Sequence, residues 1–252
     1  MKKVVIALAI SVAVMVAGTG GALAHFGMVL PAKDIVSRPG NLTVNFLFWH
    51  PMENHGMDLV KPAEAGVFFQ GRKISLLKDL KKVIKDGHTT WQVNYLIKKP
   101  GDYSFFLVPK PYWEPAEDCF IIHYTKVIVD AMAAETDWDT PVGLKMEIIP
   151  RTRPFGLYAG NIFTGQVLYK GKPLPGAEVE VEFYNADGSR KPPSPLHVTQ
   201  VVKADSRGVF SFTMPWAGWW GFAALHTDDR KIKHNGQDKD VEVGAVIWVR
   251  AY

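Results

Sequence analysis

The feature that most constrains the fold of this chain is a series of short segments in which apolar and polar side chains alternate between prolines and glycines. In segment 177–184, for example, Val179, Val181 and Phe183 alternate with glutamates. A period of two is typical of a strand buried on one face. Similar segments cover 42–49, 90–97, 103–108, 119–129, 161–169, 198–203, 209–213, 221–225 and 241–249. Helical patterns are scarce, with a weak helical period over 76–85, so we expect a mainly β chain.

The proline-bounded segment 149–154 separates these strands into two groups. We expect two antiparallel β-sandwich domains, an N-terminal one over residues 25–152 and a C-terminal one over residues 153–252, because many short strands with regular turn signals favour a sandwich. The linker is short and contains proline, which predicts domains that pack against each other rather than a loose tether.

Residues 1–24 have the pattern of a cleavable signal peptide. Lys2 and Lys3 precede an uncharged apolar stretch, and Ala22-Leu23-Ala24 is a small-x-small cleavage site. The alternative, an uncleaved membrane anchor, is disfavoured because the apolar run is shorter than the ~20 residues that a spanning helix needs. We therefore predict an exported protein whose first residue after processing is His25.

The charge balance argues against a nucleic-acid partner, and the cysteine content argues against a disulfide or a thiolate metal site. Removal of the leader leaves 27 basic residues against 25 acidic ones, with no basic stripe, so we do not expect a nucleic-acid partner. Cys119 is the only cysteine, which rules out an internal disulfide, and its apolar neighbours predict a small buried side chain rather than a metal ligand.

An N-terminal histidine offers two nitrogen donors on one residue, the α-amine and the imidazole, which together can chelate a divalent metal ion. The richest donor segment of the chain, 49–58, adds His50 and His55. His50 continues the apolar face of segment 42–49 and Pro51 then stops the strand, so His50 should point inward at the mouth of the sandwich. His123 lies within an apolar run and needs a polar partner if it is buried.

These residues predict a metal site made from His25, His50, His55 and His123. Amine and imidazole nitrogens suit nickel, copper, zinc and cobalt. The alternative that His50 and His123 are satisfied core histidines and that His55 lies on the surface remains open.

Other candidates are weaker. We expect the acidic and aromatic segment 111–118 to be a solvated loop, and His88, His197 and His234 to be exposed. His226, close to Asp228 and Asp229, could form a minor site but is expected in a loop. No nucleophile elbow, Walker loop, His-Glu-x-x-His helix or Rossmann glycine pattern is present, so we expect no enzyme.

Several motifs resemble a bacterial family of unknown function that is linked to the periplasmic component of ABC-type nickel/cobalt transport systems. They are FWHPMENHGMDL (48–59), KPYWEP (110–115), HYTKV (123–127) and TRPFGLYAGN (152–161). The resemblance implies export to the periplasm, a metal-linked role beside a membrane importer, and His25, His50, His55 and His123 as candidate ligands. The C-terminal domain resembles transthyretin-like and carboxypeptidase-regulatory-like sandwiches.

Together, these patterns predict a periplasmic protein that captures nickel, or second to it cobalt, and supplies a membrane nickel/cobalt transporter. His25 would supply amine and imidazole, His50 and His55 would close the site, and His123 would be a further ligand or would fix a ligand ring. One alternative is a copper-binding histidine-brace protein or copper oxidoreductase, because copper outranks nickel in intrinsic affinity. Another is a β-sandwich adhesion or interaction module in which the histidines are incidental.

Overall fold

The computed structural model describes residues 25–252, so the predicted signal peptide lies outside the described residues. The described chain consists of strands in four sheets and one short 3₁₀ helix, η1 (Pro195–His197). The prediction of a mainly β fold is confirmed. Within residues 25–252 no helix has the length and apolar character needed to cross a membrane.

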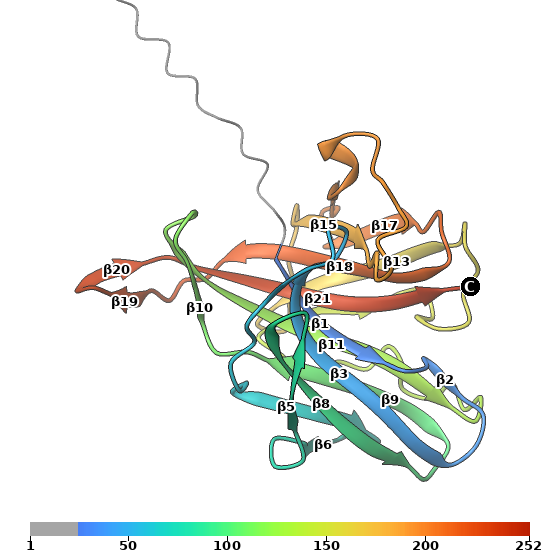
Figure 1. Cartoon of the computed structure of the whole chain (residues 1–252). Helices are drawn as coiled ribbons and strands as arrows, with labels where there is room; N and C mark the ends of the chain where they lie inside the picture. The colour runs from blue at the N-terminus through green and yellow to red at the C-terminus, as the bar shows by residue number, and fades with distance from the viewer. Residues whose placement is uncertain (1–24) are drawn as a thin grey trace, which may run out of the picture.

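The strands are grouped as follows. The first sheet has the order β1 (Phe26–Pro31), β3 (Gly40–His50), β8 (His88–Ile97) and β7 (Lys81–Lys85), and β4 (His55–Met57) pairs with β3. Eight strands of the ten-stranded sheet follow the order β16 (Gln200–Lys203), β15 (Glu178–Phe183), β18 (Gly218–Thr227), β21 (Val241–Ala251), β11 (Cys119–Ala131), β9 (Gly101–Val108), β5 (Glu64–Phe69) and β6 (Arg72–Ser75). The other two strands, β10 (Tyr112–Glu114) and β2 (Ile35–Val36), pair with β11. The third sheet has the order β12 (Met146–Pro150), β13 (Ile162–Tyr169) and β14 (Lys172–Pro173), and β17 (Val209–Thr213) pairs with β13. The last sheet is the hairpin of β19 (Ile232–His234) and β20 (Gln237–Lys239), which extends away from the body of the molecule together with the β10 segment (Figure 1).

The ten-stranded sheet carries a hydrophobic core on each face. On β21, Val246 and Trp248 join the core shared with the first sheet, whereas Ala245 and Ile247 join the core shared with the third sheet. Successive side chains of a strand point to opposite faces, so β21 is buried on both sides, which explains its nearly continuous apolar sequence. The expected sandwiches are therefore present, and they share one sheet.

Two pairings within this shared sheet differ from the expected antiparallel arrangement, and the shorter one joins β2 to β11. β11 and β21 run parallel, with Ile122 opposite Val243. β11 lies near the middle of the described chain and β21 at its C-terminal end, and parallel neighbours need a long connection rather than a hairpin. The domain boundary between residues 152 and 153 stays a prediction.

The weak helical period over 76–85 does not produce a helix. Leu76 and Leu80 lie in a turn that buries both side chains in the core shared with the first sheet, and Lys81–Lys85 forms the edge strand β7. Lysine side chains on an edge strand disfavour its pairing with strands of other chains and so reduce aggregation.

The start of β1 is held tightly over the ten-stranded sheet. The indole Nε1 of Trp248 donates a hydrogen bond of 2.9 Å to the carbonyl oxygen of Gly27. A Cβ atom at position 27 would lie 2.3 Å from Oγ1 of Thr125, so only glycine permits this close approach. These contacts fix the position of the adjacent His25.

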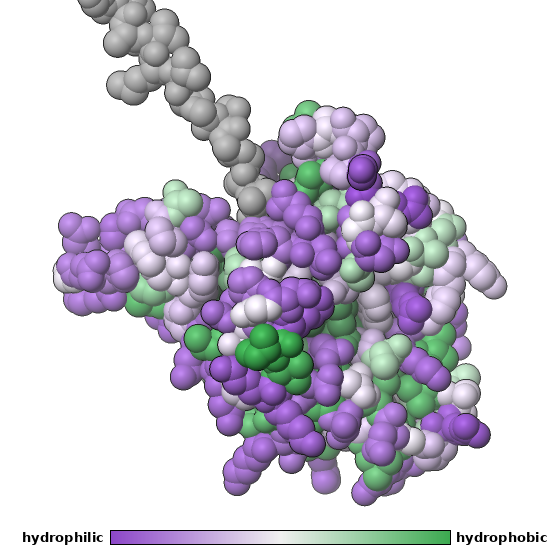
Figure 2. Space-filling model, viewed as in Figure 1, coloured by the Kyte–Doolittle hydropathy of each residue, from purple (hydrophilic) through white to green (hydrophobic). Residues whose placement is uncertain are grey.

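The surface is mostly polar on the face drawn in Figure 2, where hydrophobic residues form one small patch and isolated spots. The exposed large hydrophobic residues, such as Val60, Ile84 and Leu196, come from segments far apart in the sequence. Isolated exposed apolar side chains are ordinary for a folded protein, so this face gives no argument for a docking surface.

Candidate functional site

Three of the four predicted histidines meet at one end of the first sheet. β1 and β3 are antiparallel with Phe26 opposite Trp49, which brings His25 opposite His50. His50 is in turn opposite His55 in the β3–β4 hairpin. The ring centroids of His25 and His50 are 4.6 Å apart, and those of His50 and His55 are 6.1 Å apart. Cross-strand neighbours on one face contact each other in this way, so strand register creates the cluster.

The C-terminal half of the chain holds the hairpin turn that joins His50 to His55. The backbone N–H of Met52 donates to Oε2 of Glu182 at 3.1 Å, and the side-chain amide of Asn185 donates to the Met52 carbonyl oxygen at 3.0 Å. Burial raises the pKa of Glu182 to about 8, so this carboxyl group is mostly protonated at neutral pH. The hairpin is therefore anchored by residues more than a hundred positions away.

His25 lies in an aromatic and acidic environment. Its Nε2 is 3.0 Å from Oε2 of Glu114, and its ring packs against Phe48 and Tyr112. Burial and the nearby His50 lower the pKa of His25 to about 4, although Glu114 acts in the opposite direction. The imidazole of His25 is therefore neutral at neutral pH, the form in which a ring nitrogen can bind a metal ion.

Glu114 is a site residue that the sequence did not reveal. Segment 111–118 was expected to be solvated, but Tyr112–Glu114 forms strand β10 against β11, and the Glu114 side chain is buried. Its Oε1 accepts a hydrogen bond of 2.9 Å from the backbone N–H of Ala116. A carboxylate only accepts hydrogen bonds, so its contact with His25 places the ring hydrogen on Nε2 and leaves the lone pair of Nδ1 free.

His123 lies near this cluster, because the Phe48 ring contacts both His25 and His123 and, besides burial, the charge of His123 contributes to the lowered pKa of His25. It lies on β11 with 2% exposure, and its Nε2 is 3.4 Å from Oε1 of Glu242, the polar partner that its burial required. Its ring centroid is 6.5 Å from that of Phe48 in a T-shaped contact, and no hydrogen-bond partner of Nδ1 is found among residues 25–252. A Cβ at Gly244 would lie 2.5 Å from the imidazole, so glycine makes room for it. His123 also lines a pocket of about 270 Å³ with Phe48.

No complete metal site is preformed in the part of the chain that the structure describes. Among residues 25–252, no three His, Cys, Asp or Glu side chains are grouped so that they could hold a metal ion. In the full-length chain the backbone nitrogen of His25 is a peptide nitrogen and adds no donor. Cys119 is half-buried, and burial together with Glu242 raises its pKa to about 11, so it stays a thiol. The metal site remains a prediction.

His88 adds a fourth ring to the cluster. It was expected to be exposed, but it is half-buried at the start of β8, where its ring centroid is 5.8 Å from that of His55 and 5.9 Å from that of Trp49. Its flanking glycine and threonine gave no sign of this contact, which arises because β4 and β8 lie side by side.

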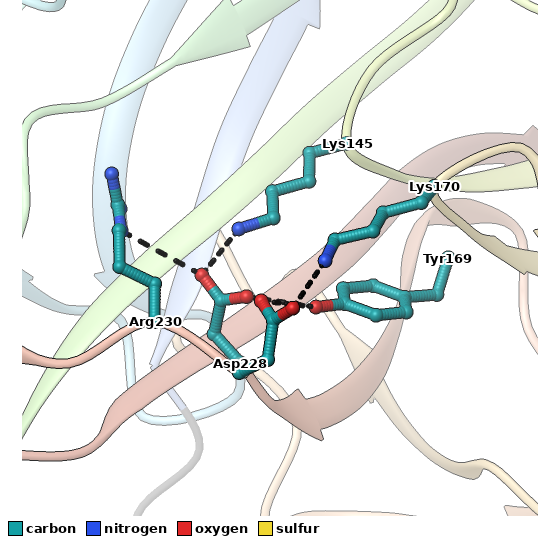
Figure 3. Close-up of polar contacts among 6 residues, drawn as sticks. Lys145, Tyr169, Lys170, Asp228 and Arg230 are labelled. Carbon is teal, nitrogen blue, oxygen red and sulfur yellow. Dashed lines mark hydrogen bonds and ion pairs between the residues drawn. The ribbon is translucent and has the colours of Figure 1, made fainter.

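The weaker candidate around His226 is a salt-bridge cluster. The carboxylate of Asp228, with no side-chain exposure, pairs with Lys145 and accepts a hydrogen bond of 2.8 Å from the hydroxyl of Tyr169. Figure 3 shows Lys145 and Arg230 directed toward the same carboxylate. Burial raises the pKa of Asp228, but the hydrogen bonds from Lys145 and Tyr169 outweigh it and hold the pKa well below its usual range. This carboxylate is neutralised by lysine and is a poor cation ligand.

We expect Asp228→Asn to lower the free energy of unfolding at pH 7 by about 1.5–3 kcal/mol, because a buried charge-assisted hydrogen bond is lost. A depressed folded-state pKa stabilises the protein above the unfolded-state pKa near 4, so the difference from the wild type should shrink as the pH falls below about 4. Urea unfolding across this range measures both effects. Asp238→Asn removes an exposed ion pair with Lys233 and should have little effect; equal losses in both variants would contradict the assignment.

Among known proteins, the chain matches one family model over most of its length. The family model described as "Domain of unknown function (DUF4198)" matches residues 22–228. No curated protein matches the chain. Dimeric latent PorU from Porphyromonas gingivalis is 12% identical over 90% of this chain and 20% of its own, with a TM-score of 0.26. A two-domain fibronectin type-III segment from chicken tenascin is 7% identical over 87% of this chain and 96% of its own, with a TM-score of 0.23. The chain spans only a fifth of PorU, and neither likeness bears on function.

Proposed function

The chain belongs to the DUF4198 family, and from the paired rings of His25 and His50 we propose that it is an exported protein that captures nickel or cobalt and supplies a membrane metal importer. The observation that carries the proposal is that the ring centroids of His25 and His50 are 4.6 Å apart, because processing after Ala24 would make His25 the new N-terminus. Export itself rests on residues 1–24, whose sequence is that of a signal peptide.

Processing after Ala24 would complete the donor set. It converts the peptide nitrogen of His25 into an α-amine on the same residue as a metal-binding ring. Glu114 holds Nε2 of that ring, so Nδ1 is the nitrogen available for the metal ion. Binding through the amine and Nδ1 of one residue closes a six-membered chelate ring. The imidazole of His50 would add a third nitrogen, with His55 next to it in the hairpin.

The chemistry of these donors favours a borderline metal ion. Nitrogen ligands in a tetragonal arrangement suit Ni²⁺ and Cu²⁺, whereas soft Cu⁺ prefers sulfur donors. Cys119 supplies no thiolate at neutral pH, which argues against a soft site. The choice of nickel or cobalt and the delivery to an importer rest on the resemblance of motifs such as His50-Pro51 to a transport-linked family.

Elemental analysis of protein taken from the periplasm with its native N-terminus tests the proposal. We expect one equivalent of nickel or cobalt per chain after gentle purification, and mass spectrometry should give a chain that begins at His25. Protein that begins at His25, carries no metal and takes up none on titration with NiCl₂ would refute it.

A copper protein is the second candidate, because an amine and two imidazoles are the three nitrogens of a histidine brace and copper binds such sites more tightly than nickel. One equivalent of copper in the same analysis, together with reductant-dependent turnover of oxygen, would favour that candidate over nickel capture.

A further inference from the structure

The histidine cluster continues beyond the proposed binding pair to the protein surface. His55, at the start of β4, is exposed, and His88, at the start of β8, is half-buried. The successive ring centroids from His88 to His55 and from His55 to His50 are 5.8 and 6.1 Å apart. His50 is 6% exposed and the His25 side chain 11% exposed, so this histidine row (His88, His55, His50 and His25) connects the exposed His55 with the buried pair.

The outer end of the row is held by packing. The rings of His88 and Trp49 are in a T-shaped contact with an interplanar angle of 82°. Trp49 is fully buried, and a Cβ at Gly56 would lie 2.4 Å from its indole, so glycine in β4 allows the indole to occupy this position. Because Trp49 is rigid, the position of His88 relative to His55 is fixed by the core rather than by a mobile loop.

The spacing of the outer pair suits a shared metal ion. Two imidazoles bound to one ion at about 2.0–2.1 Å have ring centroids roughly 4.5–6.5 Å apart for ligand angles of about 90–180°. The separation of 5.8 Å between His55 and His88 lies within this range. A carboxylate is also close, because Oδ1 of Asp58 accepts a hydrogen bond of 2.6 Å from the backbone N–H of Thr89, the neighbour of His88.

We propose that His55 and His88 form an outer metal site that takes a divalent transition-metal ion from solvent and passes it along the histidine row to His50 and His25. This inference rests on the proposed function. At each step the ion exchanges one imidazole for the next, and every consecutive pair in the row has a separation that one ion can bridge. Two protein ligands leave the other coordination positions to water, so the outer site binds weakly and releases its ion readily, as a receiving site must.

Stopped-flow mixing of processed protein with NiCl₂ tests the outer site. We expect His88→Ala to slow association by roughly tenfold, the lower end of the gain that a raised local ion concentration gives in charged clefts, while the affinity and stoichiometry of the tight site stay unchanged. A second, weaker binding event at excess nickel should also be lost. His88→Gln retains much of the side-chain volume against Trp49 and should behave in the same way, which separates the metal effect from a packing effect. His197→Ala, which removes an exposed histidine in η1, is the matched control and should leave both the rate and the weak event intact.

The outcomes separate the two claims. Tight nickel binding with the same association rate and the same weak event in wild type and in both His88 variants overturns the outer site and leaves the proposed function standing. Absence of tight binding in the wild type overturns both, because the row would then have no site to supply.

Discussion

Replacing Glu147 with alanine is expected to lower the free energy of unfolding by about 3–5 kcal/mol, because it leaves a lysine charge buried without its partner. Nζ of Lys126 is 2.7 Å from Oε1 of Glu147, and the two side chains are 1% and 2% exposed. The carboxylate also accepts hydrogen bonds from the backbone N–H groups of Val142 and Gly143 at 2.8 and 2.9 Å. The substitution therefore removes the partner of a buried cation and of buried amides in one step.

The location of this pair explains why the effect should be global. Lys126 lies on β11 of the shared ten-stranded sheet, and Glu147 lies on β12, the first strand of the third sheet. β11 has Val127 in one core and Ile128 in the other, so the pair connects a strand that faces both cores to the start of the second sandwich. Urea unfolding followed by tryptophan fluorescence measures the loss.

Two variants make this prediction specific. The double substitution Lys126→Met with Glu147→Gln removes both charges while keeping an acceptor for the amides, and it should recover most of the stability lost in Glu147→Ala. Glu178→Ala breaks the exposed pair with Lys203 and should cost about 0–1 kcal/mol. A loss in Glu147→Ala no larger than in Glu178→Ala would show that the buried pair is not needed.

Local pattern was enough to predict many of the longer strands and the direction of His50, but strands such as β1 and β5 were not predicted. The alternation of Leu42, Val44 and Phe46 identifies the buried face of β3, and His50 continues it into the interior. The pairing of His50 with His55 also follows from a local feature, since a short turn starting at Pro51 returns the chain as β4. Such features depend on residues close together in the sequence, where the period and the turn residues carry the information.

Contacts between distant segments could not be predicted in this way. Glu114 reaches His25 only because β10 pairs with β11, and Glu242 reaches His123 only because β21 lies parallel to β11. Neither pairing has a local sequence signal. The nearly continuous apolar segment 241–249 was a missed indication, since a strand that is apolar on both faces belongs between two cores. The same limit applies to His88, whose flanking residues resemble those of an exposed turn.

Adding one residue before His25 is expected to weaken nickel binding by roughly 100-fold or more, because the α-amine is displaced from the imidazole while every side chain is retained. Loss of a residue that only hydrogen-bonds a metal ligand typically lowers metal affinity by about 10–100-fold, and loss of a ligand should lower it at least as much. His50→Ala should weaken binding by at least as much, since it removes the ring 4.6 Å from His25. Isothermal titration of the processed protein with NiCl₂ measures both changes. His226→Ala, whose ring packs on Tyr169 away from the cluster, should titrate like the wild type.

The pH dependence separates loss of the amine from a general disturbance of the site. An α-amine with a pKa near 8 must release a proton when it binds a metal ion, so wild-type affinity should rise by up to about tenfold per pH unit between pH 6 and 8. Burial and His50 lower the pKa of His25 to about 4, so its ring is already neutral throughout this range and adds no proton release. The protein with the extra residue retains every histidine but has no amine next to His25, so its affinity should rise less steeply. Equal slopes in the two proteins, or equal affinities at pH 8, would exclude the amine as a ligand and with it the need for processing at Ala24.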